Sequence, residues 1–162
     1  MSNKFPLSQK YIDFINTTNV SAEFLEGTTA SGKTTVGAGV KFMRMVSQSP
    51  KKLHAIAAKT TGKAEETIIQ QDNGILDLHR NAVYCGNGDK DYKLPHIKFE
   101  DKIIYILGYS SRDKWEMVLG AQFGCVYIDE INTADIEFIR EMSTRNDYML
   151  CLLYTSPSPR DS

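Results

Sequence analysis

A glycine-bracketed segment, residues 27–34, contains the residue types that bind phosphate groups. It fits the pattern G-x-x-x-x-G-K-[ST], in which two glycines allow the backbone to approach an anion closely. Successive backbone N–H groups would point inward at the positive end of a following helix. Lys33 would reach the β- and γ-phosphates of a nucleotide, and the Thr34 hydroxyl would coordinate Mg²⁺. The expected nucleotide-binding residues are Gly27, Thr28, Thr29, Ala30, Ser31, Gly32, Lys33, Thr34 and Thr35.

Two adjacent carboxylates, Asp129 and Glu130, follow the apolar run 125–128 and form the second half of the expected site. Asp129 would hold the Mg²⁺ shell directly or through water, and Glu130 would orient and deprotonate an attacking water. Two carboxylates at the end of a buried strand repel each other unless a cation lies between them. The expected catalytic residues are therefore Glu130 and Lys33. Each motif has a simpler alternative. Residues 27–34 could be a glycine-rich turn, and Asp129 and Glu130 could form a surface turn.

The elements around these motifs predict an α/β fold. Residues 22–25 read as a strand, and Val36, Val40, Met43 and Val46 recur at helical spacing after the loop. A strand at 53–58 and a helix at 63–71 continue this rhythm, which predicts a mostly parallel sheet flanked by helices. The other expected elements are helices at 8–16, 114–119 and 135–145, hairpin strands at 97–99 and 103–107, and a strand at 148–152.

The glutamate directly after Asp129 narrows the fold class. It favours the P-loop ATPases of the additional-strand, catalytic-glutamate class, since kinases and GTPases usually lack it. That class places an extra strand between the phosphate-loop strand and the strand before Asp129. The segments 53–58 and 97–107 are compatible with this arrangement, but sequence does not order the strands.

Three further residues are candidates with a simpler alternative. Gln9 precedes the phosphate loop where several helicase-like ATPases keep an adenine-reading glutamine, although an exposed helix position also explains it. Arg140 and Arg145 lie on the predicted helix 135–145, and either could act as an arginine finger supplied to a neighbouring subunit. A surface ion pair is the alternative for both. Trp115 is expected to be a packing residue rather than a base-stacking platform.

Composition and charge exclude several classes of protein. No apolar run approaches the roughly 18 residues that span a bilayer, so no membrane partner is expected. The three cysteines and three histidines are scattered, which predicts a reducing cytosol and no protein zinc site. Between Glu26 and Glu65 all charged side chains are basic. That segment could lie near nucleotide or nucleic-acid phosphates, or form a solvated helix face.

Taken together, the segments 23–34, 127–132 and 138–141 resemble the ATPase half of a tailed-bacteriophage terminase large subunit, especially the group found in phages and prophages of Gram-positive bacteria. The resemblance covers about residues 5–151. It implies an ATP- and Mg²⁺-dependent motor that moves double-stranded DNA into the procapsid. The implied partners are DNA, the portal protein, the terminase small subunit and further copies in a ring, in the bacterial cytoplasm and transiently at the portal. Alternatives are a helicase-like or AAA+ ATPase, or a non-hydrolysing nucleotide-binding fragment.

Two features depart from the family pattern. Many members have an arginine inside the phosphate loop, whereas residues 28–31 have none, so an arginine from elsewhere, such as Arg140 or Arg145, would have to supply that charge. The family also continues beyond a strand like 148–152 into an Asn-Pro-like coupling segment and a C-terminal nuclease. We therefore expect residues 1–152 to be a partial N-terminal ATPase domain with an incomplete sheet. Residues 153–162 are expected to be a disordered or non-native tail, with the nuclease domain absent.

Overall fold

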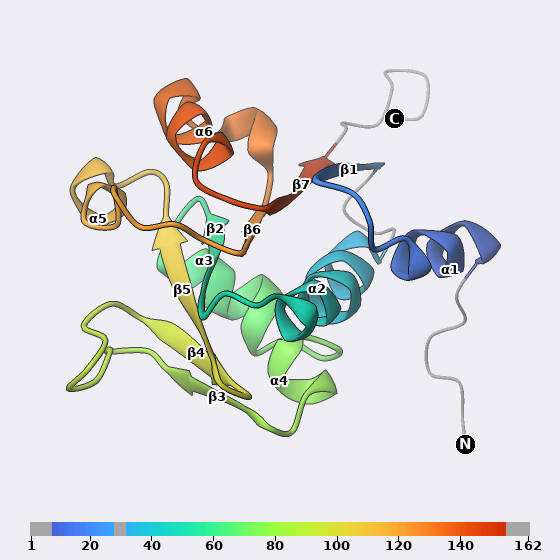
Figure 1. The fold of residues 1–162 in the computed structure, drawn as a ribbon, viewed down its shortest axis with the longest axis horizontal. Coiled ribbons are helices and arrows are strands. Elements are labelled where there is room, and N and C mark those ends of the chain that lie inside the picture. Colours follow the sequence, from blue (N-terminus) through green and yellow to red (C-terminus); the bar gives the residue numbers. More distant parts are fainter. Residues whose placement is uncertain (1–7, 28–31, 155–162) are drawn as a thin grey trace.

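The computed structural model describes residues 8–27 and 32–154, and within them seven strands form one sheet (Figure 1). The spatial order is β1-β7-β6-β2-β5-β4-β3. Strands β1, β7, β6, β2 and β5 are parallel, whereas β4 and β3 run antiparallel at one edge. The predicted mostly parallel sheet and hairpin are thus confirmed. The strands are β1 (Ala22–Gly27), β2 (Leu53–Ala58), β3 (Ala82–Cys85), β4 (His96–Phe99), β5 (Lys102–Gly108), β6 (Cys125–Ile128) and β7 (Tyr148–Tyr154).

Helical segments connect the strands and cover both faces of the sheet (Figure 1). The first helix begins as expected, because the Ser8 side chain accepts a hydrogen bond from the Tyr11 N–H at 3.3 Å. Segments η1 and η2 are π-helical, and η3 is a 3₁₀ turn. The segments are α1 (Gln9–Asn16), η1 (Thr35–Phe42), α2 (Met43–Gln48), α3 (Thr61–Ala64), η2 (Glu65–Ile69), α4 (Ile75–Leu78), α5 (Arg112–Glu116), η3 (Ile131–Thr133) and α6 (Ile136–Ser143).

The extra strand of the sheet is β7, which lies between β1 and β6. This order confirms the additional-strand class. The segments 53–58 and 97–107 do not occupy that place, because β2 and β5 lie beyond β6 on its other side. The strand between the two motifs in space therefore follows both of them in sequence.

Alternate residues of the central strands supply two separate cores. On β2, Ile56 and Ala58 pack with η1, α2, α3, η2 and α4, whereas Ala55 and Ala57 pack with α5, η3 and α6. All four side chains are fully buried. Because both faces are covered, the inner parallel strands read as continuous apolar runs, whereas the edge strand β1 alternates between exposed and half-buried residues.

The helix α6 packs Ile139 and Met142 of the expected face on the core, but not Ile136. The spacing of Ile136, Ile139 and Met142 predicts one buried face, but Ile136 is 61% exposed. Phe138 and Met142, one turn apart, are the buried residues. Phe138 packs edge-to-face on Trp115, with ring centroids 5.4 Å apart. Trp115 is buried, which confirms its predicted packing role.

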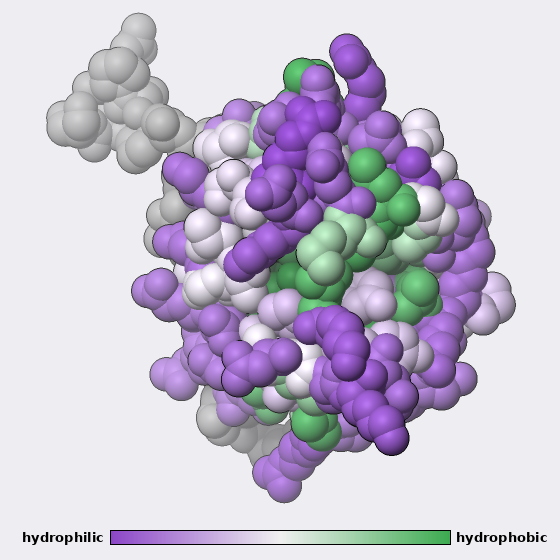
Figure 2. Space-filling model, turned by 90° about the vertical axis from the view of Figure 1, so that its left-hand side faces the viewer, coloured by the Kyte–Doolittle hydropathy of each residue, from purple (hydrophilic) through white to green (hydrophobic). Residues whose placement is uncertain are grey.

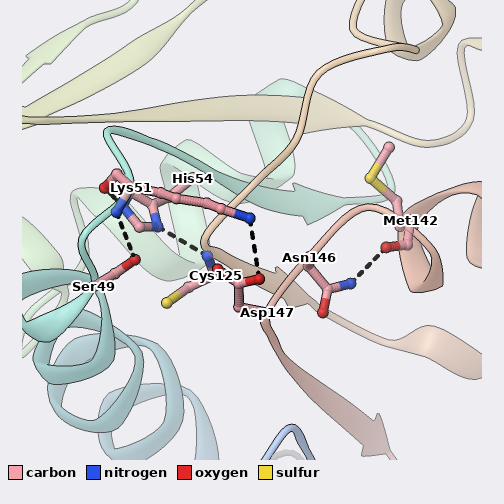
Figure 3. Close-up of polar contacts among 7 residues, drawn as sticks. All are labelled: Ser49, Lys51, His54, Cys125, Met142, Asn146 and Asp147. Carbon is pink, nitrogen blue, oxygen red and sulfur yellow. Dashed lines mark hydrogen bonds and ion pairs between the residues drawn. The ribbon is translucent and has the colours of Figure 1, made fainter.

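A hydrogen-bond network around His54 lies at the amino edge of the sheet, where the parallel strands begin (Figure 3). The Cys125 N–H donates to Nδ1 of His54 at 2.9 Å, and Nε2 lies 2.9 Å from the carbonyl oxygen of Lys51, so the proton is on Nε2. Burial lowers the pKa of His54 to about 4 and keeps the ring neutral. Lys51 also pairs with Asp147, just before β7, at 3.0 Å. These contacts join the starts of β2, β6 and β7.

The basic stretch between Glu26 and Glu65 does not present all its charges on one face. Lys41 is fully buried, with its ammonium 2.9 Å from Glu23 and 2.5 Å from the Phe14 carbonyl oxygen. Lys51 lies at the amino edge of the sheet, and Lys33 at the opposite edge.

On the side of the molecule turned to the viewer in Figure 2, hydrophobic side chains form a limited patch within a mostly hydrophilic surface. Among the described helices, none has the length and apolar character of a membrane span.

Candidate functional site

The phosphate-loop motif connects the end of β1 to the start of a helix. Strand β1 ends at Gly27, and helical structure begins at Lys33 and continues through η1. Gly32 has a φ of +75°, which favours glycine, and its carbonyl oxygen accepts the first helical hydrogen bond from Val36 at 3.1 Å. Thr35 is buried. The predicted contacts Thr28, Thr29, Ala30 and Ser31 lie outside the described residues.

The sheet topology brings the second motif to the same edge. Because β1, β7 and β6 are parallel neighbours, the carboxyl ends of β1 and β6 lie two strand spacings apart, or about 10 Å. Lys33 and Asp129 are 3% and 2% exposed, respectively. Burial lowers the pKa of Lys33, and the charge of Asp129 opposes that shift. The two predicted site residues are therefore electrostatically coupled across the edge of the sheet.

A tight turn holds the two carboxylates. The Asp129 N–H donates to the Ala57 carbonyl oxygen at 2.8 Å, which continues the pairing of β6 with β2. Glu130 then has φ 49° and ψ 54°, the left-handed conformation. For a residue with a side chain this conformation is strained by about 1–3 kcal/mol, so neighbouring groups have to hold it. Glu130 itself is partly exposed.

Tyr109, which the sequence reasoning did not single out, supports this turn. Its buried hydroxyl lies 3.0 Å from the Asp129 carbonyl oxygen, 3.1 Å from that of Glu130 and 2.7 Å from Thr133 Oγ1. Thr133 in turn donates to the Glu130 carbonyl oxygen at 2.9 Å. Burial raises the pKa of Tyr109, so the hydroxyl stays protonated and can donate. The sequence does contain a signal for Tyr109. A polar residue directly after a buried parallel strand lies at the carboxyl edge of the sheet, where the two motifs also lie.

Tyr127 contacts the Asp129 carboxylate itself. Its hydroxyl donates to Oδ1 at 3.3 Å from within the strand, two residues earlier and on the same face. The ring is fully buried and packs edge-on against Phe42 of η1, with centroids 5.9 Å apart. Asp129 therefore points toward the face covered by η1, the segment that follows Lys33 and Thr34.

The donor types at this edge fit a hard divalent cation. Asp129 offers carboxylate oxygens and Thr34 a hydroxyl, and Mg²⁺ prefers oxygen ligands. Thr34, partly exposed, directly follows the lysine that is coupled to Asp129. The predicted pair of Mg²⁺ ligands is thus compatible with the positions of both residues.

A cavity of about 700 Å³ opens beside Lys33. Gln9, the predicted adenine contact, lies on α1, which forms one wall of this cavity, but its side-chain amide donates to Asp13 at 2.8 Å. The cavity is large enough for a nucleotide-sized molecule. Its described lining residues are Ser8, Lys10, Tyr11, Phe24, Leu25, Glu26 and Lys33.

The two predicted arginine fingers differ in their positions. Arg145 pairs with Glu141 of its own chain at 3.0 Å, and its carbonyl oxygen accepts from Phe123 at 2.7 Å, just before β6. It lies at the amino end of β6, about 13 Å of strand away from Asp129. Arg140 is exposed on α6, and within residues 8–27 and 32–154 its guanidinium has no ion pair. Neither arginine is brought to Lys33 by contacts within one copy.

Comparison with solved structures finds this fold in a large terminase. The large terminase of a thermophilic bacteriophage matches with a TM-score of 0.69 and 16% identity, over 92% of this chain and 39% of that one. A structure of the same large terminase in complex with ATP-gamma-S matches with a TM-score of 0.68 and 15% identity, over 91% of this chain and 38% of that one. Its complex with ADP matches with a TM-score of 0.67 and 18% identity, over 94% of this chain and 39% of that one. The chain spans about two fifths of the length of the large terminase chains. No family model and no curated protein matches its sequence.

Proposed function

We propose that the chain is the ATP-hydrolysing part of a DNA-packaging motor of the large-terminase kind. The observation that carries this proposal is the topology, which places Lys33 after β1 and Asp129 after β6 at the same carboxyl edge of an additional-strand sheet. The fold likeness to a large terminase, which was also solved with ATP-gamma-S and with ADP, supports it.

In this proposal the motif residues divide the work of phosphoryl transfer. The backbone N–H groups of residues 27–35 and the Lys33 ammonium bind the triphosphate. Thr34 and Asp129 would hold Mg²⁺, which would supply positive charge to offset the charge of the phosphates. Glu130 orients a water molecule in line with the γ-phosphate and accepts its proton. Tyr109 keeps the main chain of Glu130 in its left-handed conformation.

The remaining transition-state charge requires an arginine from outside this arrangement. Arg140 is the better candidate, because it is exposed and has no ion pair among the described residues, whereas Arg145 is paired with Glu141. A neighbouring subunit of a ring would supply it in trans. The proposed partners are double-stranded DNA, the portal protein and the terminase small subunit, in the cytoplasm of the bacterial host and at the procapsid portal.

The substitution Glu130→Gln tests the proposed chemistry. Nucleotide binding should persist, because the amide keeps the size of the side chain, whereas phosphate release should fall by about 10²–10⁴, the range for loss of a general base. Fluorescent-nucleotide titration and a phosphate-release assay measure the two quantities separately. Glu66→Gln, at an exposed position on η2, is the matched control. Unchanged turnover in Glu130→Gln would remove Glu130 as the base, and a wild-type chain that binds ATP without turnover would favour a nucleotide-binding module.

A further inference from the structure

The hairpin at the far edge of the sheet brings together a thiol, a carboxylate and an imidazole that the sequence separates. Cys85, the last residue of β3, is paired directly with His96, the first residue of β4. Residues paired in this way project their side chains from the same face of a ladder. Asp89, from the connecting segment, places its carboxylate beside them. One ligand atom from each of the three residues lies within 4.8 Å of the other two.

The imidazole of His96 is fully buried and presents a bare nitrogen to this cluster. Nδ1 lies 2.8 Å from the Leu94 carbonyl oxygen, so it carries the proton and donates. The other ring nitrogen, Nε2, faces Asp89 Oδ2 at 3.3 Å. Among the described residues, Nε2 has no hydrogen-bond partner. A proton or a metal ion between these two atoms would satisfy both of them.

The Asp89 carboxylate is held in position by the loop. Its Oδ1 accepts from the N–H groups of Asp91 at 3.0 Å and Tyr92 at 2.8 Å, which leaves Oδ2 directed to His96. Gly88 has a φ of +73°, and a Cβ there would lie 2.1 Å from the Lys93 carbonyl oxygen, so the loop has little room to rearrange. A histidine fixed by a backbone carbonyl and a carboxylate fixed by backbone N–H groups are the outer-shell contacts that orient metal ligands.

The distances suit a small tetrahedral ion. An ion about 2.0–2.3 Å from nitrogen, oxygen and sulfur ligands separates those ligand atoms from one another by about 3.3–3.8 Å. The His96–Asp89 distance is already in that range, and the thiol needs to move little. A thiolate ligand disfavours Mg²⁺ and Ca²⁺, which take oxygen ligands, and favours Zn²⁺ or Co²⁺.

We propose that Cys85, Asp89 and His96 form a site for a zinc-like divalent cation, with water in the fourth position. The ion would tie the 86–95 segment to the hairpin at the outermost pair of strands. Lys98, whose ammonium lies 2.6 Å from Asp89 Oδ2, occupies that oxygen when the metal is absent. Metal binding therefore has to displace this ion pair.

Cobalt titration of the full chain tests this site. Protein freed of metal with a chelator and kept reduced is titrated with Co²⁺, and the thiolate-to-cobalt charge-transfer absorption is recorded, followed by displacement with Zn²⁺. The nucleotide site contains no thiol among its motif residues, so this absorption reports only on a cysteine-containing site. We expect one Co²⁺ per chain, a higher melting temperature with Zn²⁺, and tighter binding in Lys98→Met.

Near-isosteric substitutions identify the ligands. Cys85→Ser should abolish the absorption. Asp89→Asn should weaken Co²⁺ binding by more than about tenfold, because loss of a residue that only orients a ligand already costs about tenfold. Asp91→Asn removes the same charge two residues away, at an exposed position, and should bind like the wild type. The site is refuted if no saturable thiolate-to-cobalt absorption is seen in the wild type. It is also refuted if Cys85→Ser and Asp89→Asn both retain wild-type binding, or if Asp91→Asn loses as much affinity as Asp89→Asn.

Discussion

Removal of one hydroxyl group, in Tyr109→Phe, should disturb the catalytic turn without touching either carboxylate. The ring packs against Phe138 with centroids 5.7 Å apart, and phenylalanine keeps that contact. Only the contacts of the hydroxyl with the carbonyl oxygens of Asp129 and Glu130 and with Thr133 are lost. The substitution therefore tests how the turn at Asp129 and Glu130 is positioned.

The size of the effect follows from these contacts. The tyrosine hydroxyl has one hydrogen, shared among these three oxygens, and its removal takes that donor from the buried carbonyl oxygen of Asp129. Such a loss costs about 1–3 kcal/mol. The left-handed conformation of Glu130 is strained by a similar amount, about 1–3 kcal/mol, so the turn should relax once the hydroxyl is gone. A displacement of about 1 Å in a catalytic group lowers the rate by about 10²-fold.

Steady-state ATP hydrolysis and thermal unfolding measure the two consequences of Tyr109→Phe. We expect kcat to fall by about 10²-fold with little change in KM, together with a lower melting temperature. Tyr105→Phe is the matched control, because it removes the same hydroxyl group from within β5, about 13 Å of chain before Tyr109. If Tyr109→Phe keeps both the kcat and the melting temperature of Tyr105→Phe, the positioning role of Tyr109 is wrong.

Two further predictions concern the fold that supports the site. The pKa of His54 is about 4 in the folded chain and 6.5 in the unfolded chain, so the unfolded state binds more protons between these values. Stability should therefore fall by up to about 3 kcal/mol as the pH falls from 6.5 to 4. Urea unfolding across this range should show that loss in the wild type and less of it in His54→Gln. Lys41→Ala should destabilise the folded chain by about 3–5 kcal/mol, because it leaves Glu23 and two carbonyl oxygens at the end of α1 without their buried cation. Lys51→Ala is the control, because the exposed ion pair of Lys51 should contribute less than about 1 kcal/mol.

The sequence predicted the elements well because buried parallel strands and amphipathic helices leave strong local patterns. The run at 125–128 followed by Asp129 and the helix after Lys33 are such signals. Strand order is different, because parallel neighbours are joined by crossovers and pair over long sequence distances. Residues 148–152 are readable as a strand, but nothing local places β7 between β1 and β6.

The sequence likewise indicated the residues of the candidate site that belong to motifs, but not those brought together by the fold. Lys33 and Asp129 belong to motifs with fixed spacing, and the structure couples them. Tyr109 belongs to no motif, and its role depends on β5 ending beside the turn at Glu130. Cys85 and His96 meet only through the antiparallel register of a hairpin with a long connection. Ile136 fits the helical pattern of α6 but is exposed, because it lies nearly opposite the buried Phe138 around the helix axis.

The most direct test of the account is the affinity of the chain for ATP with Mg²⁺, in the wild type and in Lys33→Ala. Loss of a charge-assisted hydrogen bond of about 1.5–3 kcal/mol should weaken binding by about 10–150-fold. Lys63→Ala, at an exposed position on α3, should bind like the wild type. Wild-type affinity in Lys33→Ala would contradict the phosphate-loop assignment, and with it the proposed nucleotide site.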